Sequence, residues 1–65
     1  MVTGPDELTL ALLAQIARGA TSAEAATACH VSQSTLERRL RALREEWGVE
    51  TNIEIVVRAV REGLV

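Results

Sequence analysis

Four arginines stand close together in the middle of the chain, at Arg38, Arg39, Arg41 and Arg44. An arginine guanidinium can donate two parallel hydrogen bonds to O6 and N7 of guanine, and it also binds phosphate oxygens. A charge run of this kind is just as often the solvated face of a helix. The residues around the arginines therefore decide between a binding surface and a solvated face.

The segment that carries these arginines has the spacing of an amphipathic helix. Leu36, Leu40, Leu43 and Trp47 recur at intervals of four, three and four residues, so they form one narrow apolar stripe. Glutamate accepts from N4 of cytosine, so a polar face with a hydroxyl, a carboxylate and guanidinium groups carries the chemistry that reads base edges. Polar residues lie opposite the stripe (Ser34, Glu37, Arg38, Arg41 and Glu45) or on its flanks (Arg39 and Arg44).

Helix start and stop signals predict an all-α, four-helix domain over residues 6–65, after a tail of residues 1–5. The helices are expected over 7–18, 23–29, 33–47 and 53–62, and no strand pattern or internal repeat is present. Glu24 follows Thr21 by three residues, which predicts a capping box. The expected N-caps are Asp6, Thr21 or Ser22, Ser32, and Thr51 or Asn52. The first helix is predicted from apolar residues that recur mostly at three- and four-residue spacing, namely Leu8, Leu10, Leu12, Leu13, Ile16 and Ala17.

The second and third helices form a recognisable pair. A short alanine-rich helix, a turn of about three residues and a capped amphipathic helix make up a helix-turn-helix. In that arrangement the second helix of the pair lies in the major groove of DNA. The pattern therefore predicts sequence-specific binding to double-stranded DNA, with residues 32–44 as the reading segment.

Composition sets limits on this interpretation. The net charge of −2 argues against a non-specific nucleic-acid binder, which usually carries a positive excess. With one Trp and no Tyr or Phe, the core must consist of Leu, Ile, Val and Ala. A single cysteine favours a reduced, cytoplasmic setting at the bacterial nucleoid. We expect no membrane span and no secretory signal.

The residues that could suggest other chemistry lack partners. Cys29 and His30 are adjacent and have no further Cys or His to complete a metal site, so we expect no metal or cofactor. Ser32, Ser34 and Thr35 have no base to activate them as nucleophiles. The sequence therefore predicts neither an enzyme nor a small-molecule site.

Several spaced motifs stand along the helix-turn-helix segment: Gly19, Glu24-Ala25-Ala26, Val31-Ser32 and Thr35-Leu36. Together they resemble the LuxR-type (GerE-like) helix-turn-helix domain of bacterial transcription regulators. Further along, Trp47-Gly48-Val49 stands where that family has Leu-Gly-Val. The ending over residues 59–65 resembles its closing Ala-x-x-x-Gly-Leu-Ile.

The resemblance implies a site. Base contacts would come from Glu37, Arg38 and Arg41, the three residues that the helical spacing also places on the exposed face. Phosphate contacts would come from Ser22, Thr35 and Arg39. Ser34 and Arg44 complete the predicted DNA-binding set. Glu37 stands where the family usually has lysine, which predicts weaker affinity or a changed base preference.

The fourth helix is apolar over more than half of its circumference, more than docking on one side requires. By the same resemblance, Ile55, Val56 and Ala59 would face the core. A homodimer on a palindromic DNA site would then form through the other side, whose residues are Ile53, Val57, Val60, Arg61 and Leu64.

Three alternatives stay open. Both apolar sides of the fourth helix could be buried within a monomer. The chain could be a protein–protein interaction module that keeps the fold with weak or no DNA binding, as the negative charge and Glu37 suggest. A promoter contact of the sigma-factor kind is a minor option, because its helix-turn-helix is built similarly.

Overall fold

The computed structural model describes residues 5–65, and these form four helices without a strand. They are α1 (Glu7–Ala17), α2 (Ser22–Ala28), α3 (Gln33–Trp47) and α4 (Asn52–Arg61). The all-α, four-helix prediction is confirmed, and each helix lies within a residue or two of its expected bounds. Most of the expected tail, residues 1–4, lies outside the described part.

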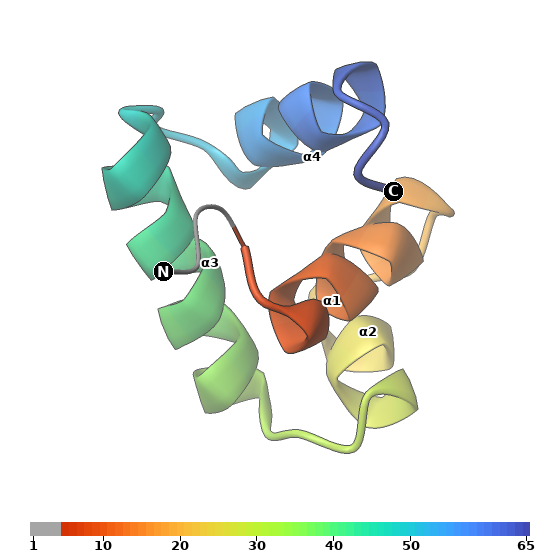
Figure 1. The fold of residues 1–65 in the computed structure, drawn as a ribbon. Helices are drawn as coiled ribbons and strands as arrows, with labels where there is room; N and C mark the ends of the chain where they lie inside the picture. The colour runs from red at the N-terminus through yellow and green to blue at the C-terminus, as the bar shows by residue number, and fades with distance from the viewer. Residues whose placement is uncertain (1–4) are drawn as a thin grey trace.

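The helices surround one small core (Figure 1). α3 runs along one side, α4 crosses near the C-terminal end of α3, and α1 lies opposite with α2 below it. α1 contacts each of the other three helices, whereas α2 and α4 are not in contact. α1 is therefore the element against which the helix-turn-helix pair and α4 are both positioned.

A side-chain cap starts every helix. The Thr9 backbone N–H donates to Asp6 Oδ1 at 2.8 Å, and Ser32 and Thr51 accept in the same way from Thr35 and Glu54. At α2 the cap is Thr21, whose side chain accepts from the Glu24 N–H, while Glu24 Oε1 accepts from the Thr21 backbone N–H at 2.8 Å. The capping box is thus confirmed. These bonds satisfy first-turn N–H groups that would otherwise lack a partner.

The apolar stripe predicted for α3 faces the core. Leu36, Leu40 and Leu43 are at most 4 % exposed. Trp47 is half-buried at the edge of the core, with the Arg58 guanidinium 4.4 Å from its ring centroid. The buried hydrophobic residues are Leu12, Leu13, Ala25, Ala26, Leu36, Leu40, Leu43, Ile55 and Ala59.

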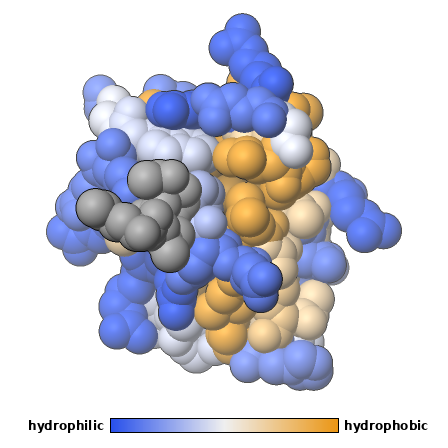
Figure 2. All heavy atoms as spheres, viewed as in Figure 1, coloured by the Kyte–Doolittle hydropathy of each residue, from blue (hydrophilic) through white to orange (hydrophobic). Residues whose placement is uncertain are grey.

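The core-facing side of α1 includes a threonine that the apolar spacing does not mark. Thr9 is buried at 5 % exposure, whereas Leu10 is half-buried outside the core cluster and Ala17 is exposed. The core-facing side of α1 is set by residues 9, 12, 13 and 16, and Leu10 and Ala17 lie about a quarter turn from its centre. A hydrophobic band remains on the surface where Figure 1 places α1 (Figure 2).

Left-handed backbone conformations orient α3 and α4. His30, in the turn before α3, has φ of +58°, a conformation that costs a non-glycine residue about 1 kcal/mol or more. The Val31 N–H closes this turn by donating to the carbonyl of Ala26 at 3.0 Å. Gly48 ends α3 with φ of +68°, where glycine carries no such penalty. His30 is exposed, as expected for a turn residue.

Candidate nucleic-acid interface

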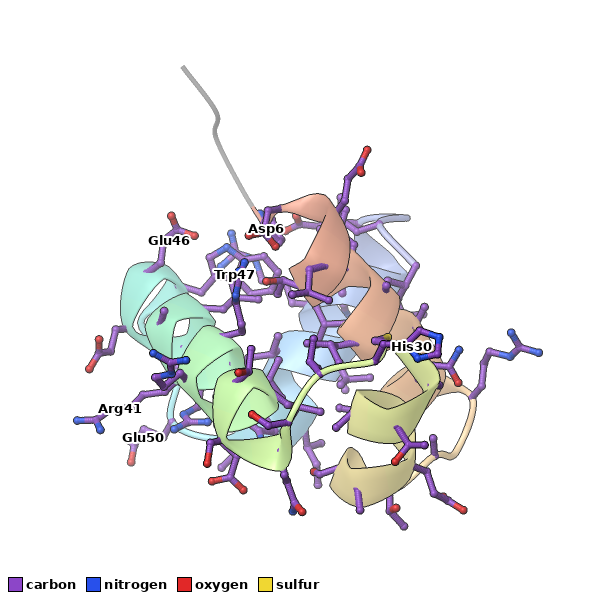
Figure 3. The ribbon with its side chains drawn as sticks, turned by 90° about the horizontal axis from the view of Figure 1, so that it is seen from below. Asp6, His30, Arg41, Glu46, Trp47 and Glu50 are labelled. Carbon is purple, nitrogen blue, oxygen red and sulfur yellow. The ribbon has the colours of Figure 1, made fainter. Side chains whose placement is uncertain are left out.

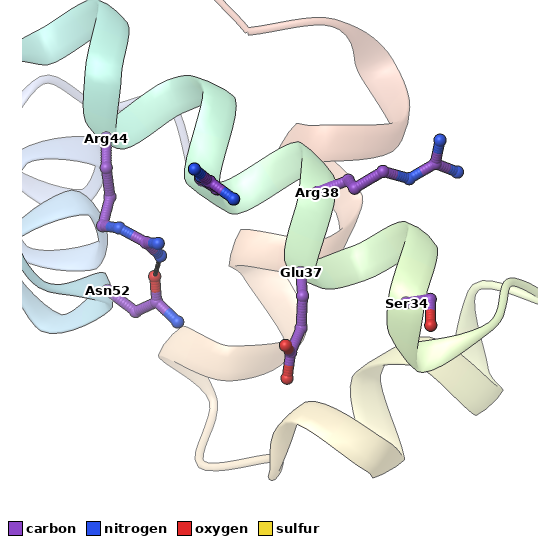
Figure 4. A pocket seen from close by; sticks show the side chains of 6 residues that line it. Ser34, Glu37, Arg38, Arg44 and Asn52 are labelled. Carbon is purple, nitrogen blue, oxygen red and sulfur yellow. Dashed lines mark hydrogen bonds between the residues drawn. The ribbon is translucent and has the colours of Figure 1, made fainter.

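An open depression of about 610 Å³ lies along the solvent side of α3. We call it the polar depression. α3 supplies five of its six lining residues and α4 supplies Asn52 (Figure 4). All five from α3 belong to the DNA-binding set that the sequence predicts. The lining residues are Ser34, Glu37, Arg38, Arg41, Arg44 and Asn52.

The outward side chains of α3 follow from its buried stripe. Because the leucines hold one face against the core, Glu37, Arg38 and Arg41 are exposed on the other. Arg41 extends from α3 into solvent, while Trp47 turns toward the interior (Figure 3). Arg41 Nε lies 3.7 Å from Glu45 Oε2, but both side chains are more than 70 % exposed, so this pair contributes little and can yield to another partner.

Arg44 is held differently from Arg41. Its Nη1 donates to Asn52 Oδ1 at 2.5 Å, and the contact is partly buried. Asn52 is the lining residue that the sequence analysis missed as a site residue, since it was considered only as a helix cap. No signal in the sequence near Asn52 indicates this role, because the turn at Gly48 is what brings the start of α4 beside α3.

All three predicted phosphate contacts lie outside the polar depression. Arg39 forms an ion pair with Asp6, the N-cap of α1. Thr35 is half-buried, and its hydroxyl accepts from the Ser32 hydroxyl at 3.0 Å. Ser22 is half-buried in the first turn of α2. Thr35, Arg38, Arg39 and Ala42 line a smaller hollow of about 230 Å³ on the flank of α3.

The Asp6 carboxylate is stabilised in its charged form. The Thr9 backbone N–H donates to it, Thr9 contributes a side-chain hydrogen bond, and the Arg39 charge lies beside it. Together these lower the pKa of Asp6 below its ordinary value of 3.8, against a smaller opposing effect of burial. Arg39 is thereby anchored to α1 at the edge of the α3 surface.

The fourth helix exposes the apolar residues proposed from the sequence. Ile53 is 74 % exposed, Val57 47 % and Val60 52 %, and Leu64 and Arg61 are also exposed. Ile55 and Ala59 are buried and Val56 is half-buried, so the core side of α4 agrees with the expectation. We call the four exposed apolar residues Ile53, Val57, Val60 and Leu64 the α4 strip.

Cys29 and His30, the residues that could suggest a metal site, lie at the end of α2 and in the turn that follows it. Within residues 5–65 no group of three or more His, Cys, Asp or Glu side chains could hold a metal ion. Cys29 is half-buried and packs against the core, as a small hydrophobic residue would. No helix of the described part is long and apolar enough to cross a membrane.

A family model described as bacterial regulatory helix-turn-helix protein, LysR family, matches residues 9–63. The chain belongs to this family. Membership supports DNA binding in bacterial transcription regulation, and such regulator domains are typically not enzymes. No curated protein and no solved structure matches the chain.

The match corrects the LuxR-type assignment, because the family found is the LysR type. The motifs behind the earlier resemblance have mostly local explanations in this LysR-family domain. Ser32 caps a helix and Gly48 ends one, and Glu24 completes a capping box. Such signals locate a helix-turn-helix but do not distinguish one family of it from another.

We expect the ion pair and cap at Asp6 to make stability depend on pH. A carboxylate with a lowered pKa in the folded state stabilises the fold above its unfolded pKa, and that contribution is lost as pH falls through the folded value. Asp6→Asn should therefore flatten the decline in the free energy of unfolding below about pH 4. Arg39→Gln should flatten it less, since the bond from Thr9 remains. Urea unfolding of the three proteins between pH 2 and 7 measures this, and parallel curves would contradict it.

Proposed function

We propose that this domain binds a specific double-stranded DNA sequence with α3 in the major groove. The observation that carries the proposal is the polar depression, where three guanidinium groups and one carboxylate lie on the exposed face of one helix. The major groove is about 12 Å wide and admits an α-helix. Supporting contacts to phosphates are assigned to Ser22 in the first turn of α2 and to Thr35 and Arg39 on the flank of α3.

The residue types in the polar depression favour base contacts at C·G pairs. Arg38 and Arg41 suit O6 and N7 of guanine, and Glu37 suits N4 of cytosine. A glutamate there also repels phosphates, and the whole chain carries a net charge of −2. Affinity for arbitrary DNA should therefore be low, and correct base pairing to α3 should supply more of the binding energy than in a strongly basic domain.

We expect Arg38→Ala or Arg41→Ala to cost about 1–3 kcal/mol of binding free energy and to relax the base preference at one position each. Arg18→Ala is the matched control, because Arg18 is exposed at the end of α1 and does not line the polar depression. Selection of bound duplexes from a random pool, followed by titration of each protein, gives both quantities. No detectable affinity of the unaltered domain at about 50 mM salt, where phosphate contacts are strongest, would refute DNA binding.

We further propose that the domain pairs as a homodimer through the α4 strip, with Arg61 at its margin, so that two copies of α3 meet a palindromic site. The support is the exposure of Ile53, Val57 and Val60 on one side of a helix whose other side is buried. A two-fold axis would bring the same strip of both copies together. A patch this small buries little area, so the pairing should be weak without DNA.

Val57→Glu should prevent this pairing, because it places two carboxylates in an apolar contact. We expect sedimentation equilibrium to show a monomer and DNA titration to lose its cooperativity on a palindrome. Ala11→Glu is the control, since Ala11 is exposed on α1 and lies off the α4 strip. If Ala11→Glu disrupted pairing and Val57→Glu did not, the interface would lie on α1 instead.

A protein-interaction module is the second candidate, and the same exposed α4 strip favours it. Under this alternative, Val57→Glu abolishes binding to another protein while the arginine variants have no effect. Pull-down with both sets of variants separates it from DNA binding.

A further inference from the structure

We propose that Arg44 and Asn52 form a phosphate clamp at the end of the polar depression, so that α4 contributes directly to DNA binding. Asn52 both positions the Arg44 guanidinium and donates to the same phosphate. This inference rests on the proposed DNA binding and adds Asn52 and helix α4 to the residues and helices that contact DNA.

The hydrogen bond between the two side chains fixes which way the amide faces. A guanidinium has donors only, so the amide must turn its oxygen toward Arg44, and the 2.5 Å contact joins Nη1 to Oδ1. The Asn52 nitrogen then points away from Arg44, as Figure 4 shows. The pair therefore offers hydrogen-bond donors only, namely the remaining guanidinium N–H groups of Arg44 and the amide NH2 group of Asn52.

A surface made of donors alone fits a ligand made of acceptors alone. The non-bridging oxygens of a DNA phosphate only accept hydrogen bonds, and among the base edges in the major groove guanine likewise presents acceptors alone, at O6 and N7. Glu37, the one carboxylate that lines the polar depression, comes from an earlier part of α3 than Arg44. The chemistry at this end of the polar depression thus fits a phosphate or a guanine edge, and the position of Arg44 on α3 decides between them.

The length of α3 favours the phosphate. Ser34 and Arg44 are ten residues apart, which corresponds to about 15 Å along a helix. The major groove is about 12 Å wide. When the first half of α3 lies across the groove at base edges, Arg44 and the start of α4 lie over its phosphate border.

The partial burial of the contact between Arg44 and Asn52 should increase the affinity for DNA. A free arginine loses rotamer freedom when it is fixed on a ligand, which reduces affinity. Arg44 is half-buried and already bonded to Asn52 before any DNA is present. Less freedom is lost when it binds, and removal of Asn52 should weaken DNA binding through Arg44.

The decisive variant is Asn52→Asp, which keeps the size and shape of the side chain. A carboxylate would pair with Arg44 at the first turn of α4, a favourable place for negative charge, so thermal stability should stay the same or rise. DNA affinity should fall about tenfold or more, and the slope of log affinity against log salt should shrink by about one. The losses should be equal on the selected duplex and on a scrambled duplex, because a phosphate carries no sequence information.

Gln15→Glu is the matched control, since it makes the same amide-to-carboxylate change on α1, away from the polar depression. Asn52→Ala should lose about three- to tenfold in affinity, and Arg44→Ala/Asn52→Ala should bind only slightly more weakly than Arg44→Ala does, because Asn52 acts mostly through Arg44. If Asn52→Asp bound DNA as tightly as Gln15→Glu, the clamp would be refuted while DNA binding stood. A loss confined to one base pair would assign Asn52 to base recognition and also refute it.

Methylphosphonate substitution of single phosphates tests the clamp with the unaltered protein, should Asn52→Asp fail to fold. Neutralising one phosphate at the groove border should weaken binding of the unaltered domain and weaken binding of Arg44→Ala much less. Equal sensitivity of both proteins at every phosphate would overturn the clamp. No binding of any duplex by the unaltered domain would remove the proposed function and the clamp together.

Discussion

Burial of Leu36, Leu40 and Leu43 against the core is the interaction on which the rest of the structure depends. These side chains are at most 4 % exposed, and they fix the rotation of α3 about its own axis. Turning α3 by one residue would bring a guanidinium toward the apolar core, at a cost of several kcal/mol. The same packing that stabilises the domain therefore determines that Glu37, Arg38 and Arg41 face solvent.

The ends of α3 determine what lies beside that face. Ser32 begins the helix after the left-handed turn at His30, and Gly48 ends it in a left-handed conformation. α4 then returns against α3, with Arg44 bonded to Asn52 and Arg58 over the ring of Trp47. α4 thus belongs to two surfaces, since its start lines the polar depression while its exposed apolar side lies elsewhere on the helix.

The sequence predicted the four helices and the face of α3 because both depend on local signals. Caps and glycines lie within a few residues of the helix ends they set, and the leucine spacing fixes one side of a helix. Three features were missed because they depend on contacts between distant segments. Asp6 meets Arg39 only when α1 packs on α3, Asn52 meets Arg44 only after the turn at Gly48, and Thr9 is buried only because of how α1 is rotated. The family type was also wrong, since helix caps are common to many helix-turn-helix proteins.

The negative net charge is compatible with this surface because charge is distributed unevenly. The arginines of α3 lie within one segment, while the acidic residues are spread along the chain. Two of these arginines, Arg39 and Arg41, already have a carboxylate partner, at Asp6 and Glu45. A phosphate must compete with those partners, which weakens attraction to arbitrary DNA and leaves the base contacts to decide where the domain binds.

The most direct test of the central claim is to map the DNA-binding face of the domain by NMR. A domain of 65 residues is small enough for complete backbone assignment, and a selected duplex can be added stepwise to the ¹⁵N-labelled protein. We expect the largest amide shifts along the exposed side of α3 from Ser34 to Arg44 and at Asn52, with little change at Ala17 or Cys29. Shifts confined to the hydrophobic band over α1 or to the α4 strip, or no shifts at all, would contradict the assignment of α3 as the reading helix.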